Sequence, residues 1–144
     1  MKYSYKNYND TGKYLINECN KKEININIIK YLVNHRVDIN KKSYGGRTPL
    51  FIACNNGNEI LIKQLKFGAD INKKDCHGET PLFNACQNGN ETIVKCLVDL
   101  GADVNITDKC GRISLFLACS NGNEMTVKYL ITFIIVYLKF IFIY

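Results

Sequence analysis

The residue types in this chain that could support chemistry are, first of all, its cysteines and histidines. The 144 residues include seven cysteines but only two histidines, His35 and His77. A zinc site needs several thiolate or imidazole ligands at short characteristic spacings such as C-x-x-C. No C-x-x-C occurs in the sequence, and no cysteine and histidine stand at ligand spacing. We therefore expect no bound metal.

Three recurring aspartates are the remaining candidates, as general acids or bases. Asp38, Asp70 and Asp103 each occupy the same place in a repeated segment, so they predict turns rather than a catalytic cluster. The pair Gly45-Gly46 leads into R-T-P and lacks the lysine of a phosphate-binding loop. Neither G-x-S-x-G nor H-E-x-x-H is present. We expect no catalysis, no cofactor and no small-molecule substrate.

The elements that position these residues come from one segment that recurs along the chain. It begins at Gly46, Gly78 and Gly111, with spacings of 32 and 33 residues. A fixed period of this size is typical of a solenoid, in which each unit buries its apolar face only against its neighbours. The period predicts an all-α solenoid of about four helix-turn-helix units.

The segment that starts at Gly78 shows the pattern of one unit. Thr80 is expected to cap a first helix that begins with Pro81, because the hydroxyl can accept a hydrogen bond from an unpaired backbone N–H group. Gly89 ends this helix, and Asn90 caps a second helix with an apolar stripe. The polar stretch that follows is too short for a third helix, so it predicts a turn or hairpin projecting between units.

With these residues, the chain resembles the ankyrin-repeat family, whose pattern carries T-P-L, small residues, a Gly-Asn turn and a closing G-A-D-V-N. The matching residues, spread over roughly positions 13–131, are Thr48-Pro49-Leu50, Ala53, Gly57-Asn58, Gly68-Ala69-Asp70, Thr80-Pro81-Leu82, Ala85, Gly89-Asn90, Gly101-Ala102-Asp103, Leu115, Ala118 and Gly122-Asn123. The resemblance implies an ankyrin-type fold with β-turn fingers. Phe51, Phe83 and Phe116 replace the family's usual histidine after T-P-L, so an apolar contact is expected where the family makes hydrogen bonds.

The cysteines recur in register, which indicates a packing role. Cys54, Cys86 and Cys119 stand at the same place in the first helix of each unit, and Cys19 takes that place in a divergent first unit. Small side chains are expected where neighbouring units press together. Reduced thiols in such positions predict a cytoplasmic protein.

The net charge of +6 does not by itself indicate a nucleic-acid partner. The lysines are scattered, and no cluster interleaved with aromatic residues accompanies them. Asn, Ile, Lys and Tyr are abundant and Trp is absent, as an AT-rich coding sequence would produce. We expect a solvated surface and no nucleic-acid partner.

The expected organisation has six parts. They are a loose leader over residues 1–12, a divergent repeat over 13–45, repeats over 46–77 and 78–110, a partial repeat over 111–131, and an apolar tail over 132–144. The second helix of the 46–77 repeat should end early, because that repeat has one residue fewer before Gly68. The partial repeat has Ile113-Ser114 in place of Thr-Pro, which predicts a weaker helix start.

Three interpretations of the tail are open. The favoured one is that the repeat array continues beyond this end, since the register breaks abruptly inside a good helix. The second is a helix that folds back on the exposed end of the stack. The third is a membrane anchor, which would make the protein membrane-associated. It is disfavoured because the apolar run from Tyr129 is shorter than the roughly 20 residues of a spanning helix and contains Lys139.

The functional surface is expected where the units differ from one another. Packing fixes most positions of a repeat, whereas finger tips and the exposed end of the first helix can vary. The predicted partner-binding residues are Tyr44, Arg47, Asn55, Asn56, His77, Glu79, Gln87, Asn88, Lys109 and Arg112. Tyr and Arg are common in binding hot spots, whereas the asparagines could equally serve as caps. The resemblance implies a non-catalytic module that binds a partner protein.

Overall fold

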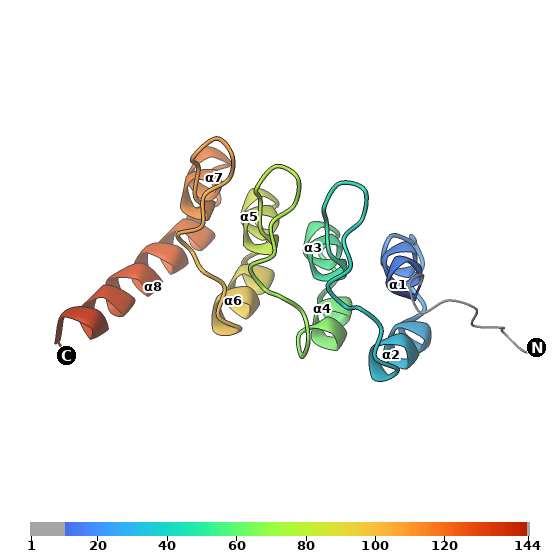
Figure 1. Cartoon of the computed structure of the whole chain (residues 1–144). Helices are drawn as coiled ribbons and strands as arrows, with labels where there is room; N and C mark the ends of the chain where they lie inside the picture. Colours follow the sequence, from blue (N-terminus) through green and yellow to red (C-terminus); the bar gives the residue numbers. More distant parts are fainter. Residues whose placement is uncertain (1–10, 144) are drawn as a thin grey trace, which may run out of the picture.

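The computed structural model describes residues 11–143, and within this range the chain forms eight α-helices and no β-strand. The helices are α1 (Thr11–Cys19), α2 (Ile26–Asn34), α3 (Pro49–Asn55), α4 (Glu59–Leu65), α5 (Pro81–Gln87), α6 (Glu91–Asp99), α7 (Ser114–Ser120) and α8 (Glu124–Ile143). Consecutive helices form pairs that stand side by side, with loops projecting between the pairs (Figure 1). The expected all-α solenoid is confirmed.

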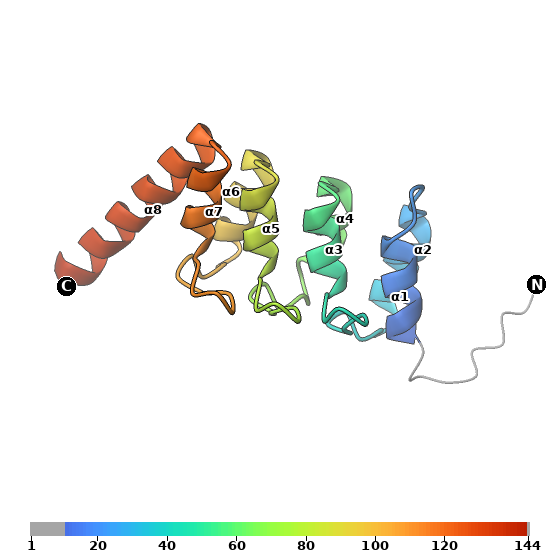
Figure 2. The ribbon, with the colours of Figure 1, turned by 90° about the horizontal axis from the view of Figure 1, so that it is seen from above.

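The core runs along the whole stack, because each pair packs on the next. The first helices α1, α3, α5 and α7 form one row and the second helices form the other (Figures 1 and 2). Phe51 and Phe83, which replace the family histidine, are completely buried between pairs. Phe116, at the same place in the last pair, is 52% exposed because no further pair covers α7 in this structure. Phe83 packs in the hydrophobic core, as the expected apolar contact requires, whereas the ring of Phe51 lies under the guanidinium of Arg47.

Helix caps follow the sequence signals with one exception. Asn58 and Asn90 accept hydrogen bonds from backbone N–H groups at the starts of α4 and α6, at 2.9 and 3.2 Å. Thr48 Oγ1 accepts from the N–H of Phe51 at 3.3 Å. Thr80, in the same register, makes no such bond, and its buried hydroxyl has no partner among the described residues. The expectation that Thr80 caps α5 by its side chain is wrong.

The ends of the second helices differ between pairs as the sequence predicts. α4 has seven residues and α6 has nine, which confirms the early end of the second helix in the 46–77 repeat. After α6, Gly101 adopts a φ of +90°, whereas Arg36 adopts +58° at the corresponding place after α2. Left-handed backbone disfavours a residue with a Cβ, so the first pair carries local strain that the third pair avoids.

The N-terminal leader and the cysteines require two corrections. α1 already begins at Thr11, inside the segment expected to be a leader, and residues 1–10 lie outside the described part of the chain. Cys19, Cys54 and Cys86 are completely buried between pairs, as expected. Cys119 is exposed. Its expected packing role fails because α7 is the last first-row helix and has no neighbour on that side.

α8 is the second helix of the last pair and continues through the segment expected to be a tail. Leu130 is fully buried, and Phe133 and Ile134 are partly buried against the core. From Ile135 to Phe142 the side chains are exposed, and the helix extends away from the stack (Figure 1). The alternative in which this segment folds back on the open end is therefore wrong. We call residues 135–142 the apolar arm.

Candidate functional site

The loops between helix pairs form a continuous platform. These loops, called fingers below, comprise residues 40–47, 72–79 and 105–112. The backbone N–H of Cys76 donates to Gly45 O at 3.0 Å, and that of Lys109 donates to His77 O at 3.0 Å. A Cβ added to Gly46 would lie only 2.8 Å from the backbone nitrogen of Cys76. Neighbouring fingers are thus in close backbone contact, which fixes the directions of their side chains.

A buried aspartate closes the second finger and another closes the third. Asp75 Oδ1 accepts hydrogen bonds from the backbone N–H groups two and four residues later, at 2.8 and 3.0 Å. Asp108 Oδ1 makes the same two bonds at 2.8 and 2.9 Å. Ser43 takes this place in the first finger, where its hydroxyl accepts from the N–H of Arg47 at 3.2 Å. Sequence reasoning missed this role, although an Asp three residues before the finger glycine was visible in both repeats.

Arg112 is held by two carboxylates. Its Nε and Nη2 lie 2.7 and 2.6 Å from Asp108 Oδ2, and its Nη2 lies 3.8 Å from Glu79 Oε1 in the preceding finger. Burial alone would raise the pKa of Asp108. The bonds donated by the backbone and guanidinium of Arg112 and by the backbone of Cys110 outweigh burial, so the pKa lies below its ordinary value. Arg112 and Glu79 therefore join the second and third fingers.

Arg47 joins the first and second fingers in a looser way. Its Nε lies 3.7 Å from Asp75 Oδ2, which is buried and makes no hydrogen bond within the described residues. Its guanidinium also stands over the ring of Phe51, 5.3 Å from the centroid. Arg47 thus has a preferred position but keeps donors available. The row Arg47, Glu79 and Arg112 alternates in charge from finger to finger.

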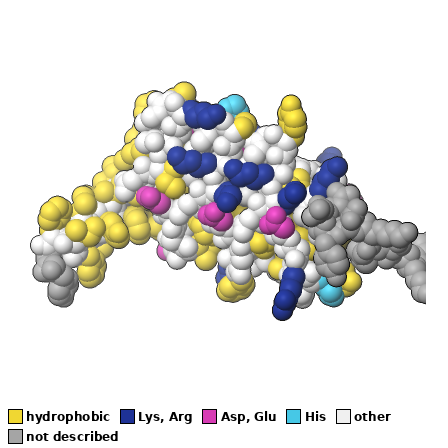
Figure 3. Space-filling view, viewed as in Figure 1, with side chains coloured by type: hydrophobic (Ala, Val, Ile, Leu, Met, Phe, Trp, Pro, Cys, Tyr) yellow, Lys and Arg dark blue, Asp and Glu magenta, His cyan; other side chains and the backbone are white. Residues whose placement is uncertain are grey.

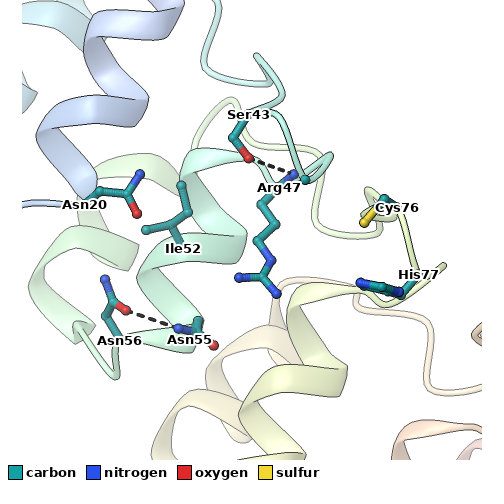
Figure 4. A pocket seen from close by; sticks show the side chains of 9 residues that line it. Asn20, Ser43, Arg47, Ile52, Asn55, Asn56, Cys76 and His77 are labelled. Atoms are coloured by element: carbon teal, nitrogen blue, oxygen red, sulfur yellow. Dashed lines mark hydrogen bonds between the residues drawn. The ribbon is translucent and has the colours of Figure 1, made fainter.

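A hollow of about 250 Å³ lies between the first and second units. It is lined by Asn20, Ser43, Gly45, Arg47, Ile52, Asn55, Asn56, Cys76 and His77. The Arg47 side chain reaches into the space between the helix-end asparagines and His77 (Figure 4). Four of the predicted binding residues, Arg47, Asn55, Asn56 and His77, therefore meet at one place.

The seam between the first two units, which borders the hollow, is hydrogen-bonded on one side only. On the finger side, Asn40 donates to Gly68 O at 3.0 Å and accepts from the N–H of Asp70 at 2.7 Å. On the helix-end side, no hydrogen bond between described residues joins the ends of α1 and α3. The later seams are tied there, since Asn88 Nδ2 donates to Asn55 O and Asn121 Nδ2 donates to Gln87 O, each at 3.0 Å.

The predicted binding residues thus divide into two groups. The first group is engaged within the solenoid: Asn88 donates a hydrogen bond to the preceding unit, and Glu79 and Arg112 form ion pairs at the fingers. Tyr44 is fully exposed at the tip of the first finger, and Lys109 is exposed at the tip of the third. We call the finger tips together with the C-terminal ends of α3 and α5 the finger strip. The exposed Gln87 also lies in it, but apart from the hollow.

The basic side chains on this face are also partly engaged. Figure 3 shows lysines and arginines spread over several fingers, with acidic side chains below them. Lys42 Nζ donates to Lys74 O at 2.7 Å, and Lys74 Nζ donates to Thr107 O at 3.0 Å. These ammonium groups fasten one finger to the next, so the net positive charge is not gathered in one open patch.

Comparison with known proteins agrees with this architecture. The family description of ankyrin repeats in three copies matches residues 1–75 and 56–137. No curated protein matches the chain. The repeated helix pairs, the fingers between them and the match over most of the sequence lead to one conclusion: the chain belongs to the ankyrin-repeat family.

Proposed function

We propose that this protein is a non-catalytic module that binds a partner protein through the finger strip. Ankyrin repeats generally bind other proteins, and the chemistry of this chain supports the same role. The observation that carries the proposal is the hollow in which Arg47, over the ring of Phe51, lies next to amide and imidazole groups and keeps guanidinium donors available.

The strip has the features of a prepared binding surface. Its backbone is held by finger-to-finger hydrogen bonds, so little order has to be gained when a partner binds. Tyr44 offers a large exposed ring at the tip of the first finger, and Arg47 offers guanidinium donors in the hollow (Figure 4). Tyr and Arg side chains supply a large share of the binding energy in protein interfaces.

The test is to capture partners with the full chain by cross-linking and to compare variants of the strip. Tyr44→Ala and Arg47→Ala should each weaken recovery of a specific partner, by about 30-fold in affinity for a residue that contributes roughly 2 kcal/mol. Tyr31→Ala is the matched control, because Tyr31 is 46% exposed on α2, in the other row of helices.

The outcome for the control decides the location of the site. A partner lost with Tyr44→Ala and kept with Tyr31→Ala supports the finger strip. A partner lost with Tyr31→Ala and kept with both strip variants would place binding on the second-row helices and refute the proposal.

A further inference from the structure

The apolar arm is exposed on every side of its helix. Consecutive residues of the arm show exposed fractions between 46% and 82%, and only Lys139 among them is charged. The residues are Ile135, Val136, Tyr137, Leu138, Phe140, Ile141 and Phe142. Eight consecutive positions cover more than two helical turns at about 3.6 residues per turn. The arm therefore has no polar face to turn toward water.

The size of this apolar surface is unusual for a soluble protein. One aromatic side chain has about 150–250 Å² of surface that can be buried. The aromatic and aliphatic side chains of the arm together therefore expose an apolar area on the order of 500–1,000 Å². The largest apolar patch on a typical soluble monomer is about 300–600 Å². Only 11% of the apolar stretch of α8 is buried in the stack, so α8 is not the core helix of the solenoid.

The all-round exposure favours a lipid environment over a protein partner. A groove or a second copy of the chain would contact one side of the helix and would leave the opposite side in water. A helix that is apolar on all sides is stable only where it is surrounded, as in a large core or in a membrane. A bilayer surrounds an inserted helix completely.

The length of the arm fits one leaflet. The inner half of α8 contacts the stack through Leu130, Phe133 and Ile134. The eight residues beyond it extend about 12 Å at 1.5 Å per residue, whereas half of the hydrocarbon core measures about 15 Å. The arm can therefore enter a leaflet while the inner half of α8 stays in place. A helix that crossed the whole bilayer would have to release Leu130.

Lys139 is compatible with this geometry. Side chains on a helix point toward its N-terminus, which here is the side of the solenoid and of the membrane surface. Lys139 lies four residues from the start of the arm, only about 6 Å along the axis. Its long side chain can therefore bring the ammonium group to the lipid headgroups.

We propose that the apolar arm inserts into one leaflet of a lipid bilayer and holds the solenoid at the membrane surface. The proposal concerns a surface separate from the finger strip, so either can fail without the other.

The test uses the absence of tryptophan from the chain. In the full-length Phe140→Trp variant, the single indole should shift its emission to shorter wavelength when phosphatidylcholine vesicles are added. Phe67→Trp is the control, because Phe67 is 88% exposed just after α4, far from the arm in sequence. Its emission should not change with vesicles.

A matched pair of charge variants tests insertion itself. In the Phe140→Trp background, Ile141→Lys should weaken vesicle partitioning about 100-fold, because lysine is strongly disfavoured in hydrocarbon. Ile60→Lys adds the same charge at a comparably exposed isoleucine of α4, 58% against 54%, and should leave partitioning unchanged.

Three results would overturn the proposal. The first is no emission shift with vesicles. The second is a shift that needs no lipid, grows with protein concentration and accompanies a dimer in sedimentation, since a second copy would then cover the arm. The third is binding to anionic vesicles only, with Ile141→Lys binding at least as well, since the net positive charge would then account for adsorption without insertion.

Discussion

Thr48 and Thr80 allow a sharp test of what holds the first helices. Both precede a proline, and both are 1% exposed. Thr48 Oγ1 accepts a hydrogen bond from the N–H of Phe51 at 3.3 Å, whereas Thr80 Oγ1 is buried and has no partner between residues 11 and 143. Replacement by valine keeps the shape and the β-branch at either site but removes the hydroxyl.

The two substitutions should differ in sign or size. Thr48→Val leaves the buried N–H of Phe51 without its acceptor, so the free energy of unfolding should fall by about 1–2 kcal/mol. Thr80→Val removes a hydroxyl that makes no hydrogen bond, so the free energy of unfolding should stay equal or rise by up to about 1 kcal/mol. The pair should therefore be separated by at least about 1 kcal/mol.

Urea unfolding followed by far-ultraviolet circular dichroism measures this difference. With a slope of about 2 kcal/mol per molar urea, the two midpoints should differ by about 0.5–1.5 M. The slope itself should be the same in both variants, because neither changes the surface exposed on unfolding. If both variants lost the same free energy of unfolding, or Thr80→Val lost more, the reasoning would be refuted, because the cap hydrogen bond of Thr48 would then not account for the difference between the two sites.

Four further predictions concern the cysteines, the arm and the stack. Burial raises the pKa of the Cys86 thiol from 9.0 to about 12. The unfolded chain therefore releases this proton at a lower pH than the folded chain, so the stabilisation is complete below pH 9 and should be lost between pH 9 and 12. Urea titrations at these pH values should show a smaller loss of stability in Cys86→Ala. With a thiol reagent at neutral pH, Cys119 should react fast and Cys54 slowly in the native protein, and equal rates would contradict the burial pattern. A chain ending at Ile134 should keep its helical circular dichroism and be more soluble, whereas unfolding on truncation would show that the arm stabilises the stack. Amide exchange should be slowest in α5, which has neighbours on both sides, and uniform protection along the stack would contradict this.

The repeat itself could be predicted because the same segment recurs several times in one sequence. The period of the glycines identifies the unit, the Asn-Gly turns identify the helix ends, and the missing residue before Gly68 predicts the shorter α4. Each of these signals depends on local backbone preferences, which a single sequence shows directly. Local signals repeated in register support one another, so the all-α solenoid follows with little ambiguity.

The failed expectations concern positions where the neighbour decides the outcome. Cys119 and Phe116 have the residue types of the buried series, but their exposure depends on whether a further unit covers α7. Thr80 has the residue type of a cap, but its hydroxyl makes no hydrogen bond to any residue that the structure describes. Residue type and spacing carry no information about such contacts.

The candidate site was predictable in its location and not in its internal contacts. Comparison between units pointed to the finger tips, and the structure gathers Arg47, Asn55, Asn56 and His77 around one hollow. The engagement of Arg112 with Asp108 was not foreseen, because residue type and spacing do not show where an arginine side chain points. Whether these residues bind a partner stays a prediction for the variants described above.

The one-sided seam between the first two units also affects the curvature of the solenoid. Asn40 joins the first two units at their fingers, whereas no hydrogen bond within the described part of the chain joins the C-terminal ends of α1 and α3. We therefore expect the first unit to tilt about its fingers more easily than the other units, which would change the width of the hollow. The hydrogen bonds of Asn88 and Asn121 oppose the same motion at the later seams. A partner that enters beside Arg47 would meet the most adjustable joint of an otherwise stiff array.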